Sequence, residues 1–402
     1  MFDTILESVL PAVAPTARPL LLDRLRASTL PVRDVRPARH RELPGARWEA
    51  EAVWDDGEHP PLFVRIFAVW TDHEFIEMCS TSGMLAPEIA VTMEGSGTSI
   101  GVLADVRGPR ARQGIGALLR ILYALSPNSL GVIDRSAVQI SPPYNLFELV
   151  RSSLPPEPRS IFTVKGCYDH GPTSTLRTYG LFRCGVPELE VLDVPRELFE
   201  AMTEFIDVVV YHLLEAEQVE PGMRLFDDYP TPVLLVPGDG ERLRVVVPVG
   251  ADLVSPVVYG DSFAEQLVLP LPDSLEEDRA ARAQEVLPRF LALLDQLGDS
   301  EAFDFAVNVA FPTSHGDPEG LWLEVERRKG DRLRTVCACK PLAVPNMKEG
   351  QRTWVRTKQI LDVRVFTPLL TYRASELLSI EELASSPEML ELFEGMMRIE
   401  VA

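Results

Sequence analysis

Two neighbouring carboxylates are the residues of this sequence whose spacing most directly suggests chemistry. Glu188 and Glu190 stand two positions apart in a segment with strand-like alternation. Both side chains would therefore leave one face of a strand, about 7 Å apart. Such a pair can act as general acid and base or can hold a hard cation. A solvated strand face with salt bridges to Arg177 or Arg183 is the simpler interpretation, and the sequence leaves both open.

Three further residues could contribute to a catalytic site. Asp134 follows a strand predicted at residues 130–133, a position where α/β proteins often place a functional side chain. His170 and His315 lie in predicted loops, and each has a serine nearby that it could orient as a nucleophile. No Gly-x-Ser-x-Gly motif accompanies them. An enzyme would need five residues to converge from distant parts of the chain: Asp134, His170, Glu188, Glu190 and His315.

The sequence predicts neither a metal nor a cofactor. Cys337 and Cys339 lie two apart on a predicted strand and could form half of a metal site, but no further ligands follow at a familiar zinc spacing. The Gly-Ser-Gly of residues 95–97 and the Gly-Ile-Gly of residues 114–116 do not complete a dinucleotide-binding motif, and no Walker lysine follows them. We expect the cysteines to be reduced, because five is an odd number for a disulfide framework.

The charge of the chain argues against several classes of partner. A formal net charge of −21 predicts binding neither to nucleic acid nor to an anionic membrane surface, since both depend on Lys and Arg. No apolar window reaches the length of a membrane helix, and no signal peptide is evident. We therefore expect a cytoplasmic protein.

One segment departs from this acidic balance. Residues 18–47 hold eight arginines against three acids, a local balance of +5 that leaves −26 for the remainder. The segment could dock on the protein's own acidic surface or bind a partner. Four leucines interleave with the arginines, and they favour docking: Leu20, Leu21, Leu22 and Leu25.

Hydrophobic periodicity predicts the elements that would position these residues. Helices are expected at residues 4–10, 19–28, 112–125, 142–150, 196–217, 274–297, 300–310 and 375–397, the sixth of them kinked or split by Pro288. Strands are expected at residues 48–53, 61–70, 99–106, 130–133, 160–168, 175–182, 321–327, 332–339, 352–357 and 360–366, with short edge strands between 233 and 269.

This order of elements indicates an α+β (mixed α/β) protein. Residues 1–40 would form an arginine-rich N-terminal arm or cap. Residues 41–272 would form a larger mixed-sheet domain with covering helices, and residues 273–402 a smaller, bent antiparallel sheet with helices.

Three stretches carry a resemblance to a known family. The run Thr-Tyr-Gly-Leu-Phe-Arg-Cys-Gly-Val-Pro-Glu-Leu-Glu that begins at Thr178 is similar, together with residues 128–134 and 320–325, to a bacterial family of uncharacterised proteins that end in a YegJ-like module. The resemblance spans residues 60–366 and implies a YegJ-like fold for the C-terminal module, without an activity. Tyr179 and Gly320 stand where that family usually has histidines, so chemistry based on those histidines is not expected here.

Two functions follow as hypotheses. The first is a non-enzymatic protein that binds another protein, for example a basic one, in an immunity-type or regulatory role. The alternative is a hydrolase-type enzyme whose site would lie at the domain junction. The oligomeric state stays open.

Overall fold

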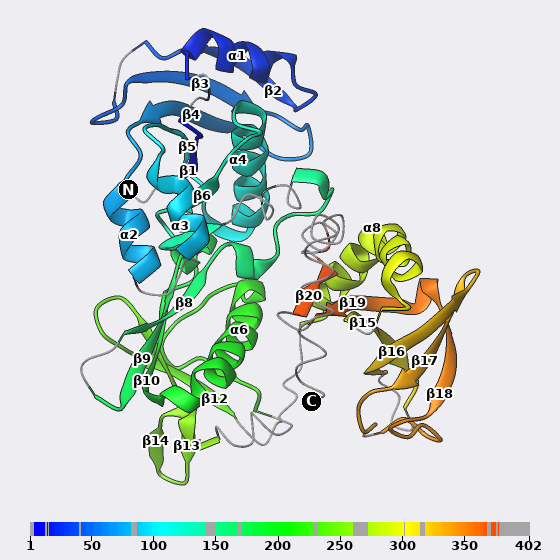
Figure 1. Cartoon of the computed structure of the whole chain (residues 1–402). Coiled ribbons are helices and arrows are strands. Elements are labelled where there is room, and N and C mark those ends of the chain that lie inside the picture. Colours follow the sequence, from blue (N-terminus) through cyan, green and yellow to red (C-terminus); the bar gives the residue numbers. More distant parts are fainter. Residues whose placement is uncertain are drawn as a thin grey trace. The chain divides into compact units, whose positions relative to one another are not determined.

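The computed structural model describes residues 4–377 except for 13, 15, 40–41, 82–86, 142–145, 147–149, 168–170, 228–231, 260–271, 301, 314–317, 342, 368–370 and 375–376. The chain divides into two compact units (Figure 1). The first unit comprises Met1–Val150 with Pro155–Pro272, and the second comprises Arg151–Leu154 with Asp273–Ala402. Helices accompany three antiparallel or mixed sheets, which confirms the predicted α+β class.

The first unit contains two sheets, of which the first is antiparallel. Its strand order is β2-β3-β4-β5-β1-β6-β7. The strands are β1 (Thr4–Val9), β2 (Val32–Pro37), β3 (Trp48–Trp54), β4 (Leu62–Val69), β5 (Ser99–Ala104), β6 (Gly131–Asp134) and β7 (Gln139–Ser141). The predicted pairing of residues 48–53 with 61–70 is confirmed by the register from Trp48 opposite Ala68 to Trp54 opposite Leu62.

Helices cover much of this sheet from both sides. Helix α4 (Ala111–Leu125) packs against β5 and β1, and α1 (Arg18–Ala27) packs against α4 and β2. On the opposite face, α2 (His73–Thr81) and α3 (Pro87–Glu94) contribute Cys79 and Met93 to a core cluster with Val9 of β1. Figure 1 shows the sheet between these two groups of helices.

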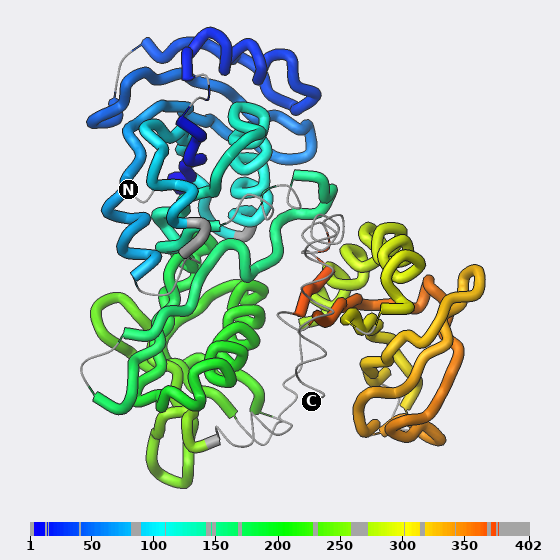
Figure 2. Tube along the Cα trace, viewed as in Figure 1, coloured from blue at the N-terminus to red at the C-terminus, as the bar shows by residue number. Residues whose placement is uncertain are grey.

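The N-terminal segment differs from its prediction. Residues 4–10 were expected to form a helix in a cap, but residues 4–9 are β1, which lies between β5 and β6 inside the sheet. Figure 2 shows this segment running into the centre of a sheet built from later residues. This segment forms a strand because its backbone groups are hydrogen-bonded to neighbouring strands on both sides and all but one of its side chains are buried. Helix α1 is confirmed, and it buries Leu21, Leu22 and Leu25 while Leu20 stays exposed.

The second sheet is mixed, with the order β11-β12-β13-β10-β9-β8 and β14 paired to β13. Strands β10 and β13 are parallel, and the other pairs are antiparallel. The strands are β8 (Thr163–Cys167), β9 (Thr173–Tyr179), β10 (Leu189–Pro195), β11 (Arg224–Leu225), β12 (Val233–Pro237), β13 (Leu243–Val249) and β14 (Asp252–Val254). Helix α6 (Phe199–Glu215) packs against β8 and β10 through the predicted stripe, of which Met202, Phe205, Val209 and Leu213 are buried.

The second unit contains the third sheet, which is antiparallel with the order β18-β17-β16-β15-β19-β20. Its strands are β15 (Asp304–Phe311), β16 (Glu319–Lys329), β17 (Arg332–Cys337), β18 (Arg352–Arg356), β19 (Ile360–Phe366) and β20 (Thr371–Arg373). Helix α8 (Asp273–Leu297) contributes Leu287, Phe290 and Leu294 to the core on one face of this sheet. It is one continuous helix, so Pro288 does not split it.

The helix predicted at residues 300–310 is wrong, because residues 304–311 form β15 in the middle of the sheet. The four strands predicted at residues 321–366 are confirmed as β16 to β19. The helices predicted at 142–150 and 375–397 and the strand at 267–269 fall wholly or largely on residues outside the described set. Within the described set, no helix combines the length and apolar character that crossing a bilayer requires.

Candidate functional site

The run after Thr178 folds into a tight turn that leads from β9 to β10. A short 3-10 helix, Leu181–Cys184, lies between Gly180 and Gly185, whose φ angles are +107° and +79°. A Cβ atom on Gly180 would lie 2.7 Å from the carbonyl oxygen of Ile161. Both the backbone angle and this close approach therefore require glycine at position 180.

Glu188 lies just before β10 and holds this turn closed. Its Oε1 accepts a hydrogen bond from the backbone N–H of Gly180 at 2.7 Å, and its Oε2 accepts one from the hydroxyl of Thr178 at 2.7 Å. The Thr178 hydroxyl oxygen in turn accepts the backbone N–H of Leu189, also at 2.7 Å. The carboxylate of Glu188 thus bonds the two ends of the turn together, which is a structural role.

Asp134 is paired with a fully buried arginine of the same turn. Its Oδ2 lies 2.9 Å from Nη1 of Arg183, and its Oδ1 accepts the backbone N–H groups of Ser136 and Ala137 at 3.0 and 3.1 Å. The Arg183 guanidinium also donates to the carbonyl oxygens of Gly180 and Ile161. This ion pair joins the end of β6 in the first sheet to the turn of the second sheet, so both charges are compensated where water does not reach.

Glu190 occupies a separate, fully buried position on β10. Its Oε1 accepts hydrogen bonds from Nε and Nη2 of Arg244 at 3.0 and 2.8 Å and from the backbone N–H of Asp239 at 3.2 Å. Its Oε2 lies 3.8 Å from Nε of Arg177 on β9. The predicted salt bridge to Arg177 is therefore present, and the stronger partner is Arg244, which the parallel pairing of β10 with β13 brings opposite Glu190.

Tyr179 and Gly320 stand where the family that the sequence resembles usually has histidines. The surroundings of each fit the residue that is present. The hydroxyl of Tyr179 lies 3.8 Å from Sγ of Cys167, and burial raises the pKa of this phenol. Tyr179 therefore stays protonated at neutral pH. A Cβ atom at Gly320 would lie 2.9 Å from Oδ1 of Asn308, so this side chain fills the space that a histidine would need.

The five sequence candidates do not form one described constellation. Asp134 and Glu188 both hold the Gly180 turn, one through Arg183 and one directly, whereas Glu190 has its own arginine partners. His170 and His315 lie outside the described residues. Each described acid has charged or backbone donors as partners, so what the arrangement accomplishes chemically is to neutralise buried charge and fix the turn.

The cysteine pair also makes local contacts. The thiol of Cys337 donates to the carbonyl oxygen of Cys339 at 3.1 Å, and burial raises the pKa of Cys337. Among the residues that the structure describes, no three His, Cys, Asp or Glu side chains are grouped so that they could hold a metal ion.

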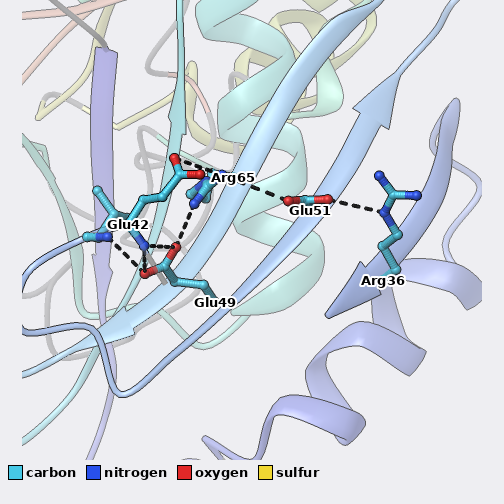
Figure 3. A network of polar contacts seen from close by, with 6 residues as sticks. Arg36, Glu42, Glu49, Glu51 and Arg65 are labelled. Carbon is cyan, nitrogen blue, oxygen red and sulfur yellow. Dashed lines mark hydrogen bonds and ion pairs between the residues drawn. The ribbon is translucent and has the colours of Figure 1, made fainter. Parts of the chain in front are cut away.

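A polar network in the first sheet was not anticipated from the sequence (Figure 3). Buried Glu49 accepts the backbone N–H groups of Glu42 and Leu43, each at 2.9 Å, and a hydrogen bond from Nη1 of Arg65 at 2.9 Å. Arg65 also lies 3.0 Å from Glu42 and 3.8 Å from Glu51. Burial lowers the pKa of Arg65, but its hydrogen bonds to the two glutamates Glu49 and Glu42 outweigh this and raise it, so the cation is firmly held.

The network continues to the edge strand β2, where Nε of Arg36 lies 3.1 Å from Oε2 of Glu51. Glu49, Glu51 and Arg65 alternate with the buried Ala50 and Ile66, so the network lies on the face of β3 and β4 that is opposite α4. The sequence signal was available: glutamates alternate with alanines in Trp48–Trp54.

The comparisons with known proteins concern the second sheet. Residues 164–234 match a family described as "Protein of unknown function (DUF4026) C-terminal". The comparison with curated proteins gave no match, and neither did the comparison with solved structures. The matched residues run from β8 into β12 and include the Gly180 turn, Glu188 and Glu190. The run singled out in the sequence therefore lies within the stretch that is similar to this domain of unknown function.

Proposed function

We propose that this protein acts by binding another protein, a basic one, and not by catalysis. The observation that carries the proposal is Phe63 of β4, whose side chain is 77% exposed although its backbone is held in regular pairing opposite Val53 of β3. It projects from the face that carries the Glu49–Arg65 network, two residues along the strand from Arg65. Exposed aromatic side chains on an ordered surface are the usual anchors of protein interfaces.

The surroundings of Phe63 favour a basic partner. The loop that joins β3 to β4 lies at the end of the strand where Phe63 stands, and it holds Asp55, Asp56 and Glu58. Burial raises the pKa of Asp56, but hydrogen bonds from His59 and nearby amides outweigh this and lower it to about 2. The loop is therefore anionic at neutral pH. We call Phe63 with residues 55–60 the Phe63 surface.

Charge on the rest of the chain supports the same interpretation. A net charge of −21 attracts a basic protein over a distance and speeds its association at low ionic strength. We propose an immunity-type or regulatory role in the bacterial cytoplasm, with residues 273–402 as a YegJ-like module. Hydrolysis is disfavoured because Asp134, Glu188 and Glu190 are each engaged in hydrogen bonds that hold the fold.

The test compares two baits that differ only at the surface in question. Wild-type protein and Phe63→Ser are used for affinity capture, with Val249→Ser as a control, because Val249 is another exposed residue of the same unit. A captured protein is then purified and titrated calorimetrically at low and high salt. We expect Phe63→Ser to weaken binding by at least about tenfold and the control to leave it unchanged, with affinity falling as salt rises.

Two results would count against the proposal. One is a captured protein that binds all three baits equally in the titration. The other is an affinity that does not respond to salt. Because Phe63 is exposed, the substitution should leave the free energy of unfolding within about 0.5 kcal/mol of wild type, so that a loss of binding is not a loss of folding.

A further inference from the structure

The third sheet carries a row of like charges that the fold does not explain. Lys329 on β16 lies directly opposite Arg332 on β17, and Arg332 lies directly opposite Arg356 on β18. All three side chains are exposed. Facing residues on neighbouring strands have Cβ atoms about 5 Å apart, and like charges placed so are destabilising. A bound anion would therefore stabilise this row of three cations across three strands.

The neighbouring positions on the same face, by contrast, have an acid that neutralises their arginines. Glu326 lies 2.9 Å from Arg334 and 2.7 Å from Arg352, and it bridges them from the bulge in β16. Arg327, in the same row as Arg334, lies over the ring of Trp354 with 5.7 Å between guanidinium carbon and ring centroid. Within the described part of the chain, no ion pair reaches Lys329, Arg332 or Arg356.

The charge is concentrated in this part of the protein. Residues 327–334 and 352–358 contain eight cations and a single acid, Asp331, a balance of +7 in a chain whose total is −21. The flanking residues Leu333 and Val355 are buried in the core that α8 shares. The cations that alternate with them, Arg332, Arg334, Arg352 and Arg356, therefore lie on the face of the sheet that is turned away from α8. Arg328, opposite Leu333, lies on the other face and pairs with Asp295 of α8 at 2.7 Å.

Protection of a sheet edge explains only part of this pattern. Cations on an edge strand prevent two sheets from joining edge to edge, and β18 is an edge strand. Arg332, however, lies between β16 and β18 and is paired on both sides, so no edge needs protection at this position. Lys329 lies in the part of β16 that extends past its pairing with β15. Trp354, at the centre of β18, is 43% exposed. An exposed tryptophan on an edge strand favours association with another strand and does not protect the edge.

We propose that the outer edge of β18 is a docking site for an extended acidic segment of another protein, which adds to the third sheet as a further strand. The edge offers the backbone groups of Arg352 and Trp354 for hydrogen bonds that a peptide can form and a nucleic acid cannot, whereas the N–H of Arg356 already donates to Oε1 of Gln359 at 3.0 Å. The side chains of Arg352, Trp354 and Arg356 point to the same face and would each have a residue of the added strand opposite. The added strand supplies the anion that the row of three cations lacks.

The geometry also defines the segment that fits. An acidic residue opposite Arg356 and another opposite Arg352 are four positions apart, and an apolar residue midway between them faces Trp354. We call this the acidic strand pattern. The site belongs to the second unit and uses none of the residues of the Phe63 surface, so the two proposals can fail independently.

The experiment uses a synthetic peptide with this pattern, two glutamates four positions apart and a valine midway, flanked by threonines. It is titrated against the full chain by fluorescence anisotropy. A peptide of the same composition with adjacent glutamates is the first control, and a peptide with proline in place of the valine is the second, since proline is poorly tolerated in a paired strand. Amide hydrogen exchange then reports whether β18 becomes protected.

We expect saturable binding of the patterned peptide, at least about tenfold tighter than either control peptide, with protection of β18 amides. Arg352→Glu/Arg356→Glu should abolish this binding and should gain binding of a peptide with lysines in place of the glutamates, because the charges are exchanged. Lys340→Glu, an exposed cation beyond the end of β17, should change neither affinity.

Four outcomes with the wild-type side chains overturn the proposal: equal affinity for all three peptides, binding without protection of β18, tighter binding of a single-stranded oligonucleotide than of the patterned peptide, or binding only after residues 380–402 are deleted. The third would make the face a nucleic-acid surface, and the fourth would make the chain's own acidic C-terminal segment its occupant. Loss of both the glutamate and the lysine peptide in the double variant would likewise refute the proposed pairing.

Discussion

Replacement of Arg183 tests whether the run after Thr178 serves the fold. Arg183→Met keeps most of the length and apolar stem of the side chain but removes the guanidinium. That group is fully buried, bonds Oδ2 of Asp134 at 2.9 Å, and donates to the carbonyl oxygens of Gly180 and Ile161. The substitution therefore leaves a buried carboxylate and two buried carbonyl groups without this partner.

The magnitude follows from the burial of both charges. Removing one member of a buried ion pair costs about 3–5 kcal/mol, since the remaining charge stays buried without its counter-ion. The backbone N–H groups of Ser136 and Ala137 still reach Oδ1 of Asp134 and keep the loss near the lower end of that range. Asp134→Asn should cost a similar amount, because it leaves the Arg183 cation buried. The double variant should cost less than the two single losses added together, by about 2–3 kcal/mol.

The assay must isolate the first unit, because a chain with two units need not unfold in one step. Urea-dependent hydrogen exchange of peptides from β6, β9 and β10 gives the free energy of unfolding of the elements concerned. Arg33→Met is the matched control, since Arg33 pairs with Asp55 at 2.9 Å but is 58% exposed, and it should cost less than about 1 kcal/mol. Losses below about 1 kcal/mol for Arg183→Met, or additive losses in the double variant, would refute the reasoning.

Three further substitutions test other parts of the first unit, each by the same urea-dependent hydrogen exchange. Gly180→Ala should destabilise by about 1–3 kcal/mol, because φ is +107° and the added Cβ meets the Ile161 carbonyl; a neutral result would remove the steric argument. Phe205→Ala should cost about 3–5 kcal/mol, since Phe205 is buried in the α6 stripe, and a loss near 0.5 kcal/mol would place this helix outside the core. Burial raises the pKa of Asp72, but the Phe75 amide and Arg135 outweigh it, so the folded value lies below the unfolded one. Asp72 therefore stabilises the fold above its unfolded pKa, and this contribution is lost as pH falls through the folded pKa. Asp72→Asn should therefore lower the free energy of unfolding at pH 7 but change it little near pH 2. An equal loss at both pH values would contradict this.

Long periodic segments were predictable from the sequence because their own residues decide the outcome. The stripe of α6 and the paired strands β3 and β4 satisfy their burial with neighbours in the sequence or with one adjacent element. Strands β16 to β19 of the second unit were equally accessible, since they follow one another in the chain. In each case the hydrophobic period alone indicates the element and its buried face.

The two wrong helices have a common cause. Residues 4–9 and 304–311 each form an inner strand of a sheet. Residues 4–9 pair on both sides with segments that come much later in the sequence, and residues 304–311 pair with the following strand β16 on one side and with the more distant β19 on the other. The second also carries a period-two signal, because Phe305, Val307 and Val309 alternate with more polar positions. The apolar density of both segments favours a helix when it is judged by composition, whereas the long-range strand pairing that decides the outcome is not a local property.

The role of the carboxylates could not be read from their spacing, because their partners come from elsewhere in the chain. Arg183 reaches Asp134 across 49 positions, and Arg244 reaches Glu190 across 54 through the parallel pairing of β10 and β13. Spacing identified polar residues that matter, but an acid buried with a guanidinium and an acid poised for catalysis look the same in one sequence. What separates them is the number of donors already engaged, and for Glu188 these are a backbone N–H at 2.7 Å and a hydroxyl at 2.7 Å. A carboxylate held in this way gives up stabilising hydrogen bonds if it moves to a substrate, so Glu188→Gln should affect the Gly180 turn before it affects any reaction.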